Sequence, residues 1–495
     1  MFGQNLNNTA SVSGAENSEL TALSVNSLKT KWTFTTGGDV SARAAVVKGI
    51  VYFPDWSGHL YAVNADDGRL VWSRNILKDY LSGVFNNPPA MVVSRTTPYV
   101  DPNTNTMYIG TQQGAWILAI DTTTGALRWK AQLDNHPFAI DTGSPIVSQG
   151  VLYVGVSSNE EIAASDPGYP CCSFRGSVVA LNASNGALKW QSFTVPAGYT
   201  GGAIWSSTIV PDPARGVVYA TTGNNYSTPT DPAYTSCINN GGTQESCLSP
   251  DDHFDSVLAL HMTDGKVAWS QRLSNGDDWN LACLPSIPGP NCPKPTGTDY
   301  DFGSGVNLFT IQTSGGAKTV LGAGQKSGIY VALDPDDNGA VLWATQVGPG
   351  GPLGGIQWGS ATDGKRIYVA ISNSNSEMHI LQPSGQTTSG GSWSALDPAS
   401  GKILWQTPDP GGAMDQGPMA VTNNVVYAPS MAGTGDNMFA LNAATGAIMW
   451  RFPSGGSVLA GATIANNVVF WGSGYSNIPG FTGNNKFYAF SRNGQ

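Results

Sequence analysis

The segment ALNAATGAIMW, residues 440–450, contains the pattern on which the fold depends. It starts with two apolar residues, continues through Asn442 and small residues to Gly446, and ends four positions later at Trp450. This pattern predicts a β-hairpin. One strand ends near Asn442, Gly446 supplies the positive φ of a tight turn, and the next strand carries Trp450 into the interior.

The same pattern recurs along the whole chain. Its copies are AVNADDGRLVW (62–72), AIDTTTGALRW (119–129), ALNASNGALKW (180–190), ALHMTDGKVAW (259–269), ALDPDDNGAVLW (332–343), ALDPASGKILW (395–405) and ALNAATGAIMW (440–450). Each copy follows a second apolar run and a further short strand, so each unit predicts about four strands. Four-stranded sheets repeated at this spacing indicate a β-propeller, in which each repeat Trp packs between neighbouring blades.

The two ends of the chain predict the last blade. The C-terminal residues 486–495, KFYAFSRNGQ, begin another copy but stop before its Trp, whereas LKTKWTF (28–34) contains Trp32 without the preceding strand. Joining the two halves completes a blade and removes an exposed sheet edge. The sequence therefore predicts an all-β fold. It is an eight-bladed β-propeller of four-stranded antiparallel blades, one domain over residues 1–495, in which the strand at about 28–37 completes the last blade.

The composition agrees with this fold and argues against some functions. Gly occurs 61 times and Pro 31 times while charged residues make up only 12%, which is typical of a turn-rich β protein. The formal net charge of −10 argues against nucleic acid as a partner. No run of 18 apolar residues is present, so we expect no membrane span. The opening MFGQNLNNTA shows no signal peptide.

Four of the cysteines are spaced for local disulfides. Cys237 and Cys247 enclose one loop-like segment, and Cys283 and Cys292 enclose another. Both spacings suit disulfides formed in an oxidising compartment. No CxxC pair or CxxCH motif is present, so the sequence predicts neither a zinc site nor a covalently attached haem.

The remaining two cysteines, Cys171 and Cys172, are adjacent in YPCCSFRGS (169–177). A bond between them closes a small ring that constrains little of the unfolded chain, so a role in stability is weak. Two separate thiols, or two bridges that lead elsewhere, are the alternatives.

Most candidate functional residues lie where blades three to five depart from the repeat. They are Glu160, Glu161, Asn224, Asn225, Asp299, Asp301 and Lys326. Carboxylate and amide oxygens that converge at one end of a ring predict a site for a hard cation, by default Ca²⁺. Each carboxylate alone is also explained as a solvated loop residue, and Lys326 as an ion-pair partner. Trp205 lies outside the Trp repeat, so blade packing does not explain it.

Four segments resemble the pyrroloquinoline quinone (PQQ)-dependent alcohol dehydrogenases, an eight-bladed propeller family, and most closely its polyvinyl alcohol dehydrogenase members. They are YPCCSFRGS (169–177), GVSSNEE (155–161), TDYDFGSG (298–305) and GGIQWGSATDG (354–364). The resemblance covers essentially the full chain. It implies a periplasmic or secreted enzyme that oxidises alcohols, secondary and possibly polymeric, with PQQ and Ca²⁺ or a lanthanide. A separate cytochrome c-type protein would then accept the electrons.

The resemblance also implies roles for single residues. Bonded to each other, Cys171 and Cys172 would form one wall against the flat quinone, and Trp205 would form the other. In the methanol-oxidising members the cysteine pair precedes the metal-binding Glu, whereas here it follows it, so the pair could instead shape the funnel. The other implied roles are Asp299 as catalytic base; Glu161, with Glu160 as the alternative, Asn224 and Asp301 as metal ligands; Lys326 on the quinone carbonyls; and Ser157, Ser158, Arg175 and Arg43 near its carboxylates.

Three alternatives stay open. A PQQ-dependent dehydrogenase of sugars or other alcohols would share the same cofactor site. A non-enzymatic propeller that scaffolds protein assembly shares the repeat but gives no reason for Glu161, Asn224, Asp299 and Lys326 on adjacent blades. A carbohydrate-binding or hydrolytic propeller would use Asp299 and Glu161 as an acid–base pair, but it leaves the cysteine pair unexplained.

Overall fold

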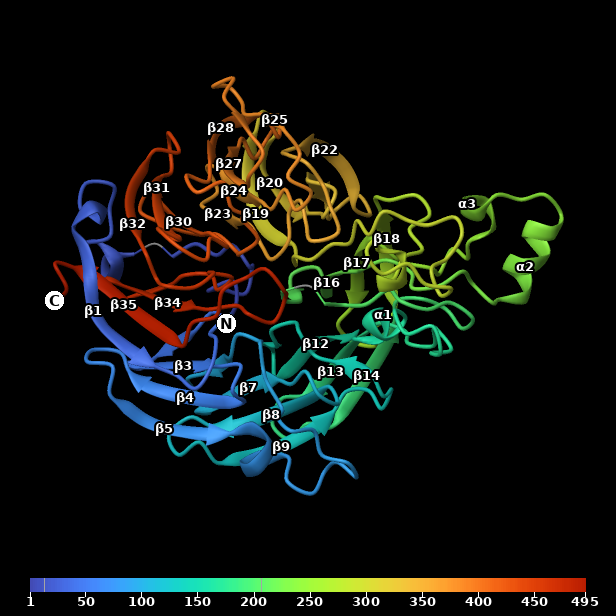
Figure 1. The fold of residues 1–495 in the computed structure, drawn as a ribbon, viewed down its shortest axis with the longest axis horizontal. Helices are drawn as coiled ribbons and strands as arrows, with labels where there is room; N and C mark the ends of the chain where they lie inside the picture. The colour runs from blue at the N-terminus through green and yellow to red at the C-terminus, as the bar shows by residue number, and fades with distance from the viewer. Residues whose placement is uncertain (13, 206) are drawn as a thin grey trace.

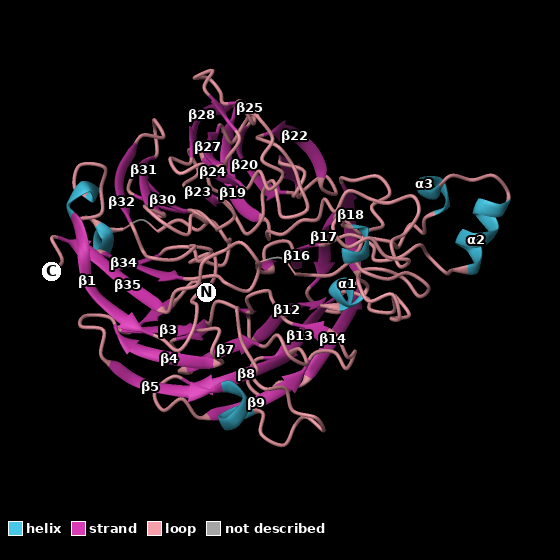
Figure 2. Cartoon of the chain, in the orientation of Figure 1, coloured by secondary structure: helices cyan, strands magenta, loops and turns pink. Residues whose placement is uncertain are grey.

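A computed structural model describes residues 1–12, 14–205 and 207–495. Eight four-stranded antiparallel sheets stand around a central axis like blades (Figure 1). Strands dominate the regular structure, and the few helices lie in connections between them (Figure 2). The predicted all-β, eight-bladed β-propeller is confirmed.

In the first four blades the strands follow one another in chain order. They are β2 (Ala45–Val47), β3 (Ile50–Pro54), β4 (His59–Asn64) and β5 (Leu70–Asn75); β6 (Tyr99–Asp101), β7 (Thr106–Gly110), β8 (Trp116–Asp121) and β9 (Leu127–Gln132); β11 (Ile146–Ser148), β12 (Val151–Ser158), β13 (Ser177–Asn182) and β14 (Leu188–Phe193); and β15 (Val210–Asp212), β16 (Val217–Thr221), β17 (Ser256–His261) and β18 (Val267–Arg272). A short extra strand, β10 (Ala139–Ile140), also pairs with β12.

The other four blades complete the ring. They are β19 (Asn307–Thr313), β20 (Gly316–Gly324), β21 (Ile329–Asp334) and β22 (Ala340–Gln346); β23 (Ala361–Thr362), β24 (Ile367–Ile371), β27 (Ser392–Leu396) and β28 (Ile403–Pro408); β29 (Ala420–Thr422), β30 (Val425–Pro429), β31 (Met438–Asn442) and β32 (Ile448–Phe452); and β33 (Thr463–Ala465), β34 (Val468–Ser473), β35 (Lys486–Arg492) and β1 (Leu28–Thr35). A small hairpin of β25 (His379–Ile380) and β26 (Thr387–Thr388) is inserted after β24.

The two ends of the chain close the ring. Strand β1 pairs antiparallel with β35, and Trp32 lies opposite Ala489. In the other seven blades the repeat Trp also lies opposite the repeat Ala, as Trp450 lies opposite Ala440. The N-terminal strand therefore restores the interrupted eighth copy of the motif, as the sequence predicted.

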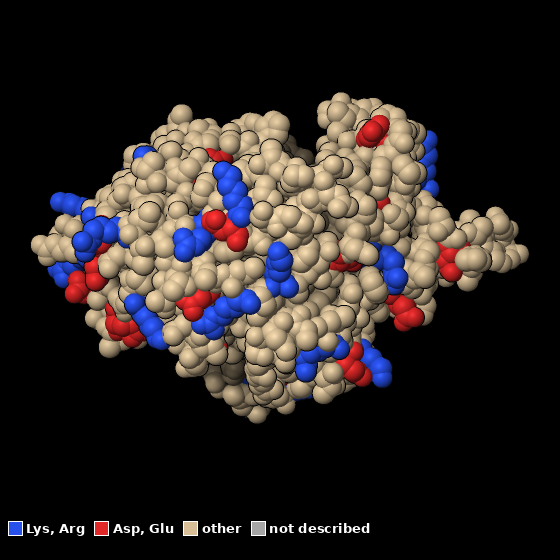
Figure 3. Space-filling model, turned by 90° about the horizontal axis from the view of Figure 1, so that it is seen from below, with Lys and Arg blue, Asp and Glu red and all other residues tan. Residues whose placement is uncertain are grey.

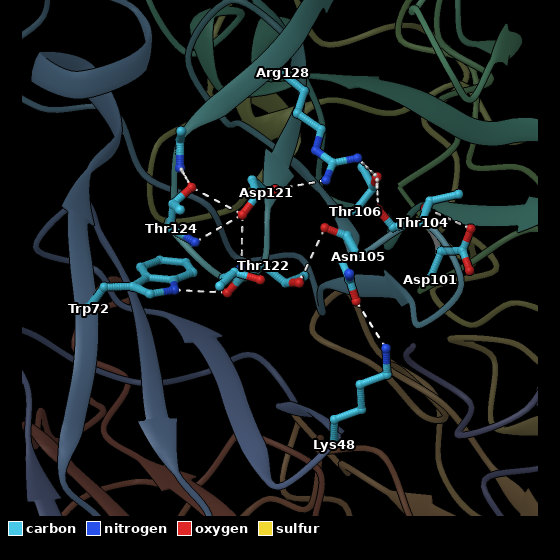
Figure 4. A network of polar contacts seen from close by, with 12 residues as sticks. Lys48, Trp72, Asp101, Thr104, Asn105, Thr106, Asp121, Thr122, Thr124 and Arg128 are labelled. Atoms are coloured by element: carbon cyan, nitrogen blue, oxygen red, sulfur yellow. Dashed lines mark hydrogen bonds and ion pairs between the residues drawn. The ribbon is translucent and has the colours of Figure 1, made fainter.

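In seven of the eight blades, a hydrogen bond from the repeat Trp joins the blade to the next one. The Nε1 group of Trp72 donates a hydrogen bond to the carbonyl of Thr122 in the following turn at 2.9 Å (Figure 4). The equivalent bonds run from Trp32 to Ala65, Trp129 to Ala183, Trp190 to Met262, Trp343 to Pro398, Trp405 to Ala443 and Trp450 to Leu28. A Cβ at Gly125 would lie 2.9 Å from the Trp72 ring, so this glycine serves packing as well as its φ of 70°.

Hydrophobic clusters fill the interfaces between blades. One cluster combines Tyr52 and Trp72 of one blade with Met107, Ile109 and Leu118 of the next. Because burial of a large apolar side chain contributes about 1.5–3 kcal/mol, these interfaces hold the blades in fixed positions. The ring therefore acts as a rigid frame for the loops that connect its strands.

The connections carry the helices and the disulfides. The short helices are α1 (Glu160–Ala163), α2 (Pro232–Asn239) and α3 (Gln244–Cys247), the 3₁₀ segments Ala15–Asn17, Val25–Ser27 and Leu281–Cys283, and a π-helical turn at Ile76–Tyr80. Helices α2 and α3 form an arm that projects beyond the ring (Figure 1). The two predicted local disulfides, Cys237–Cys247 and Cys283–Cys292, are present, and Cys171 is bonded to Cys172.

The surface carries few charges. On the side of the molecule seen in Figure 3, Lys and Arg lie singly or beside Asp and Glu, and no field of one sign forms. Among the described residues, no helix combines the length and the apolar character that crossing a bilayer requires.

Candidate active site

A cavity of about 710 Å³ lies at one end of the ring. In an antiparallel meander, the connection from the second to the third strand and the connection to the next blade lie at the same end of the sheet. The candidate residues occupy such connections or, in the case of Ser157 and Ser158, the end of β12 that leads into one, which explains why the fold gathers them. Those that line the cavity are Ser157, Ser158, Glu161, Trp205, Asp299, Asp301 and Lys326.

A buried ion pair forms the polar centre of this cavity. The Nζ of Lys326 lies 2.7 Å from Oδ1 of Asp299 and 3.6 Å from Oδ2 of Asp301. Asp299 is 2% exposed and Lys326 is 5% exposed, so water screens the pair weakly. The same ammonium group lies 5.0 Å from the centre of the Trp205 ring, whose Nε1 donates to Asp301 at 2.6 Å.

Three carboxyl groups share this one ammonium group, and the pKa values reflect the imbalance. Burial raises the pKa of Glu161 to about 7, although Lys326 opposes the shift. Burial also raises the pKa of Asp299 well above its ordinary value. Burial lowers the pKa of Lys326, but the nearby carboxylates outweigh it and leave that pKa above its ordinary value, so the lysine stays charged. The site can therefore accept additional positive charge.

Asp277 holds Asp299 in place. Its Oδ1 accepts the backbone N–H of Asp299 at 2.9 Å and its Oδ2 accepts that of Tyr300 at 2.7 Å. Asp299 has a φ of +60°, a left-handed conformation that Asp tolerates better than most residues but that needs support. Asp277 was not predicted from the sequence, because it lies in NGDDWN (275–280) and carries no signal except its departure from the repeat.

Asn224 provides an amide oxygen that has no hydrogen-bond partner among the described residues. The Nδ2 of Asn224 donates to the carbonyls of Asn225 at 2.8 Å and Trp279 at 2.7 Å, which fixes the orientation of the amide. Its Oδ1 is buried and accepts no hydrogen bond from the described residues. Asp301 Oδ1 accepts the backbone N–H of Asn224 at 3.1 Å. An oriented amide oxygen beside carboxylates fits a hard cation such as Ca²⁺ or a lanthanide.

The amide oxygen is a necessary member of this set. Within the described ranges, no three His, Cys, Asp or Glu side chains form a ready-made metal cluster. The carboxylates therefore fit a metal ion only together with Asn224. A flat quinone fits beside them, because Trp205 offers an aromatic face in the same lining.

Glu160 faces away from this centre and holds the loop of the cysteine pair. Its Oε1 accepts the hydroxyl of Tyr169 at 2.6 Å, and the backbone N–H of Ser173 at 2.8 Å together with the Ser173 hydroxyl at 3.1 Å. Its Oε2 accepts the backbone N–H of Phe174 at 2.7 Å. The side chain is fully buried. Glu161, and not Glu160, is therefore the glutamate that reaches the cavity.

Besides Glu160, Asn224 and Asn225, four other candidates are not among the residues that line the cavity: Cys171, Cys172, Arg175 and Arg43. Cys172 packs with Trp205 around one apolar cluster, but neither Cys171 nor Cys172 is among the lining residues. Arg175 places its guanidinium 4.2 Å from the Phe193 ring and donates to the carbonyl of Val195 at 2.7 and 2.9 Å.

Arg43 is also committed elsewhere. It is 1% exposed and donates to the carbonyl of Phe2 at 2.9 Å and to the carbonyls of Pro418 and Met419. These contacts tie Phe2 of the N-terminal segment to the connection that precedes β29. Arg43 lines a separate small cavity instead of the one that contains Asp299.

Comparison with known proteins assigns the family. A family model named PQQ_2 and described as outer membrane protein assembly factor BamB matches residues 16–271 and 389–495. The chain belongs to this PQQ_2 family. The matched ranges contain most of the blades and the segments with Glu161, Asn224 and Trp205.

Two polyvinylalcohol dehydrogenases are similar in sequence to this PQQ_2 chain. The protein from Pseudomonas sp is 32% identical over 372 residues, which is 72% of this chain and 53% of the relative. The protein from Sphingopyxis sp. (strain 113P3) is 31% identical over 394 residues, 76% of this chain and 54% of the relative. The chain spans about half the length of these relatives. The resemblance to the PQQ-dependent alcohol dehydrogenases is confirmed.

Solved structures show the same fold. The quinohemoprotein alcohol dehydrogenase of Comamonas testosteroni superposes with a TM-score of 0.69 at 19% identity, covering 100% of this chain and 80% of that one. A europium-containing methanol dehydrogenase superposes with a TM-score of 0.71 at 17% identity, covering 99% of this chain and 97% of that one. At these identities the likeness extends to the propeller alone.

Three further residues of the PQQ_2 chain line the cavity and were not predicted. The guanidinium of Arg95 lies 4.4 Å from the Trp358 ring, and Trp358 meets Trp205 edge to face with ring centres 5.2 Å apart. Trp279 is also in the lining. Both Trp279 and Trp358 fall outside the Trp repeat, which is the signal that identified Trp205. Arg95 has no comparable signal in the sequence.

Proposed function

We propose that residues 1–495 form one catalytic propeller domain that oxidises secondary alcohols, polyvinyl alcohol among them, to carbonyl compounds with PQQ and a metal ion. The observation that carries the proposal is the buried Asp299–Lys326 pair beside Asp301, Glu161 and Trp205 in one cavity. The similarity to proteins named polyvinylalcohol dehydrogenase supports the choice of substrate.

Named residues hold each group in this proposal. Glu161, Asn224 and Asp301 would bind Ca²⁺ or a lanthanide, Trp205 would offer its ring to the quinone, and Ser157 and Ser158 would contact its carboxylates. When bound, PQQ supplies the two-electron acceptor and the metal supplies the charge that polarises it. The cysteine pair and Arg175 would need a rearranged loop to reach the cofactor.

In this proposal the residues of the chain accept one proton and stabilise one negative charge. Asp299 accepts the proton of the substrate hydroxyl, because a buried carboxylate within hydrogen-bond reach is an adequate general base. Asp277 and Lys326 hold Asp299 in position. Lys326 also places a fixed positive charge beside the oxygen that would gain negative charge while the alcohol is oxidised. Because the site is little exposed to water, the attraction between the two charges is stronger than it would be at the surface.

We propose further that the electrons leave for an acceptor of the cytochrome c type outside this propeller domain. Residues 1–495 themselves contain no CxxCH motif. Three disulfides support a periplasmic or secreted location, where thiols are oxidised. The alcohol, the acceptor and the location are all parts of this proposal.

The test is reconstitution of the protein with PQQ and Ca²⁺, followed by dye reduction with 2-propanol, 2,4-pentanediol and polyvinyl alcohol. We expect reduction with all three, and a loss of about 10²–10⁴ in rate for Asp299→Asn with PQQ still bound. Near wild-type turnover of this variant would remove Asp299 as the base. Reduction by an aldose but by none of the alcohols would replace the substrate class.

A further inference from the structure

An apolar group of side chains lines the same cavity as the proposed catalytic residues. It consists of Ile162 in α1, Leu281, Leu284 and Ile287 in the loop 280–292, Leu353 after β22 and Ile478 after β34. Ile162, Ile287 and Leu353 are 56%, 43% and 37% exposed, respectively. Large aliphatic side chains that stay exposed together around a cavity indicate a binding surface.

We propose that these six residues, the aliphatic subsite, bind the hydrocarbon chain of the alcohol while its hydroxyl reaches Asp299. The inference rests on the proposed function and adds the part of the substrate that gives specificity. Among the described residues, Arg95 is the one charged lining residue outside the catalytic group, and it is stacked on Trp358. An uncharged chain therefore fits this lining better than an acid or a phosphate ester.

The main segment of the subsite is fixed before any ligand binds. The disulfide Cys283–Cys292 closes the loop that carries Leu284 and Ile287. The Nδ2 of Asn291 lies 3.0–3.1 Å from the carbonyls of three residues in and after α1: Ala164, Asp166 and Tyr169. A loop held at both ends loses little conformational freedom on binding, so contacts with it translate into affinity.

A second asparagine ties this loop to the floor of the site. The Nδ2 of Asn280 donates to the carbonyl of Asn291 at 2.8 Å and to that of Tyr226 at 2.9 Å, and lies 3.9 Å from Sγ of Cys171. The loop of the adjacent cysteines and the loop of the aliphatic subsite therefore support each other. The adjacent cysteines therefore lie behind the cavity lining and support it, although they do not line the cavity themselves.

The chemistry of the lining separates an alkyl chain from a sugar. A sugar carries a hydroxyl group on almost every carbon, and aliphatic side chains cannot replace the hydrogen bonds that these groups make with water. Polyvinyl alcohol carries a hydroxyl only on every second carbon, so methylene groups remain free to contact the aliphatic subsite. An alkyl chain gains about 0.8 kcal/mol for each methylene group removed from water, which is about fourfold in affinity. The subsite therefore predicts that kcat/KM rises with the chain length of the alcohol.

The experiment measures kcat/KM of the PQQ- and Ca²⁺-loaded protein for 2-propanol, 2-butanol, 2-hexanol and 2-octanol. For wild type we expect a rise of about fourfold per methylene group until the subsite is filled. Leu284→Ser and Ile287→Ser are expected to lower the ratio between 2-octanol and 2-propanol by about tenfold each. Leu188→Ser, at an exposed leucine of β14 outside the cavity, is the matched control and should keep the wild-type ratio.

A second measurement does not depend on turnover. Calorimetric titration with the ketones 2-butanone, 2-hexanone and 2-octanone should show the same dependence on chain length in wild type, and a weaker one in Leu284→Ser/Ile287→Ser. A flat series in both assays overturns the aliphatic subsite. If the ketones bind with the expected slope while no alcohol reduces the dye, the subsite stands and the proposed oxidation fails.

Discussion

Substitution of Glu160 by glutamine tests whether Glu160 stabilises the fold while the adjacent Glu161 binds the metal ion. The carboxylate of Glu160 accepts four hydrogen bonds, two of them from the backbone N–H groups of Ser173 and Phe174. Glutamine has the same size, but its amide nitrogen cannot accept a hydrogen bond. In Glu160→Gln at least one of these buried donors therefore loses its acceptor, whichever way the amide is oriented.

The size of the effect follows from these contacts. A hydrogen bond to a charged group contributes about 1.5–3 kcal/mol, and an unsatisfied buried donor costs about 1–3 kcal/mol. We expect Glu160→Gln to lower the free energy of unfolding by about 2–4 kcal/mol. Glu161 makes no hydrogen bond within the described part of the chain, and burial raises its pKa, so the neutral amide of Glu161→Gln should not lower the free energy of unfolding of the metal-free protein.

The assay is urea unfolding of the protein without cofactors, followed by Trp fluorescence, and a Ca²⁺ titration of each variant under native conditions. Glu160→Gln should shift the unfolding midpoint and retain Ca²⁺ binding once folded. Glu161→Gln should not lower the midpoint, and it should weaken Ca²⁺ binding. Equal midpoints for the two variants would refute the reasoning, and so would loss of Ca²⁺ binding in Glu160→Gln alone.

Two further results are expected from stability measurements. Gly125→Ala should lower the free energy of unfolding by about 2–4 kcal/mol, because it adds a clash with Trp72 to the strain of a positive φ. Gly49→Ala, at a φ of 76° with open space around it, should lower it by only about 1–2 kcal/mol. Equal unfolding midpoints would contradict the role of Gly125 in packing. Burial raises the pKa of Asp252 to about 7, against about 3.9 when unfolded, so between these values the native state binds more protons and stability falls as pH rises. Asp252→Asn should remove on the order of 3 kcal/mol of that fall between pH 4 and 8, and identical pH profiles of unfolding would contradict it.

The fold was predictable because the residues that define each blade lie close together in the sequence. The Ala and the Trp of each motif lie opposite each other in one hairpin, so their spacing in the sequence is set by a single turn. The same reasoning reached the closing blade, since Trp32 and Ala489 are recognisable halves of one hairpin although the chain separates them. Which loops are long was also readable, as insertions between copies.

The polar centre was predictable for a different reason. Asp299, Asp301 and Lys326 stand out because the repeat does not need them, and the meander then places their loops at one end of the ring. The direction of a side chain is not fixed by this argument. Arg175 forms a bridge with Gly201 through its backbone and turns its guanidinium toward Phe193 on the outer strand, which its position after the cysteine pair does not reveal.

The apolar part of the cavity could not be predicted from the sequence. Ile162, Leu284 and Ile478 are separated by long stretches of chain, and each lies in a loop with no periodic pattern. They share one cavity only because the ring closes and brings connections from different blades together. An isolated aliphatic residue in a loop is ordinary, whereas several around one cavity are not. In this propeller, departures from the repeat predict the polar groups of the cavity, whereas its aliphatic lining emerges only from the assembled loops.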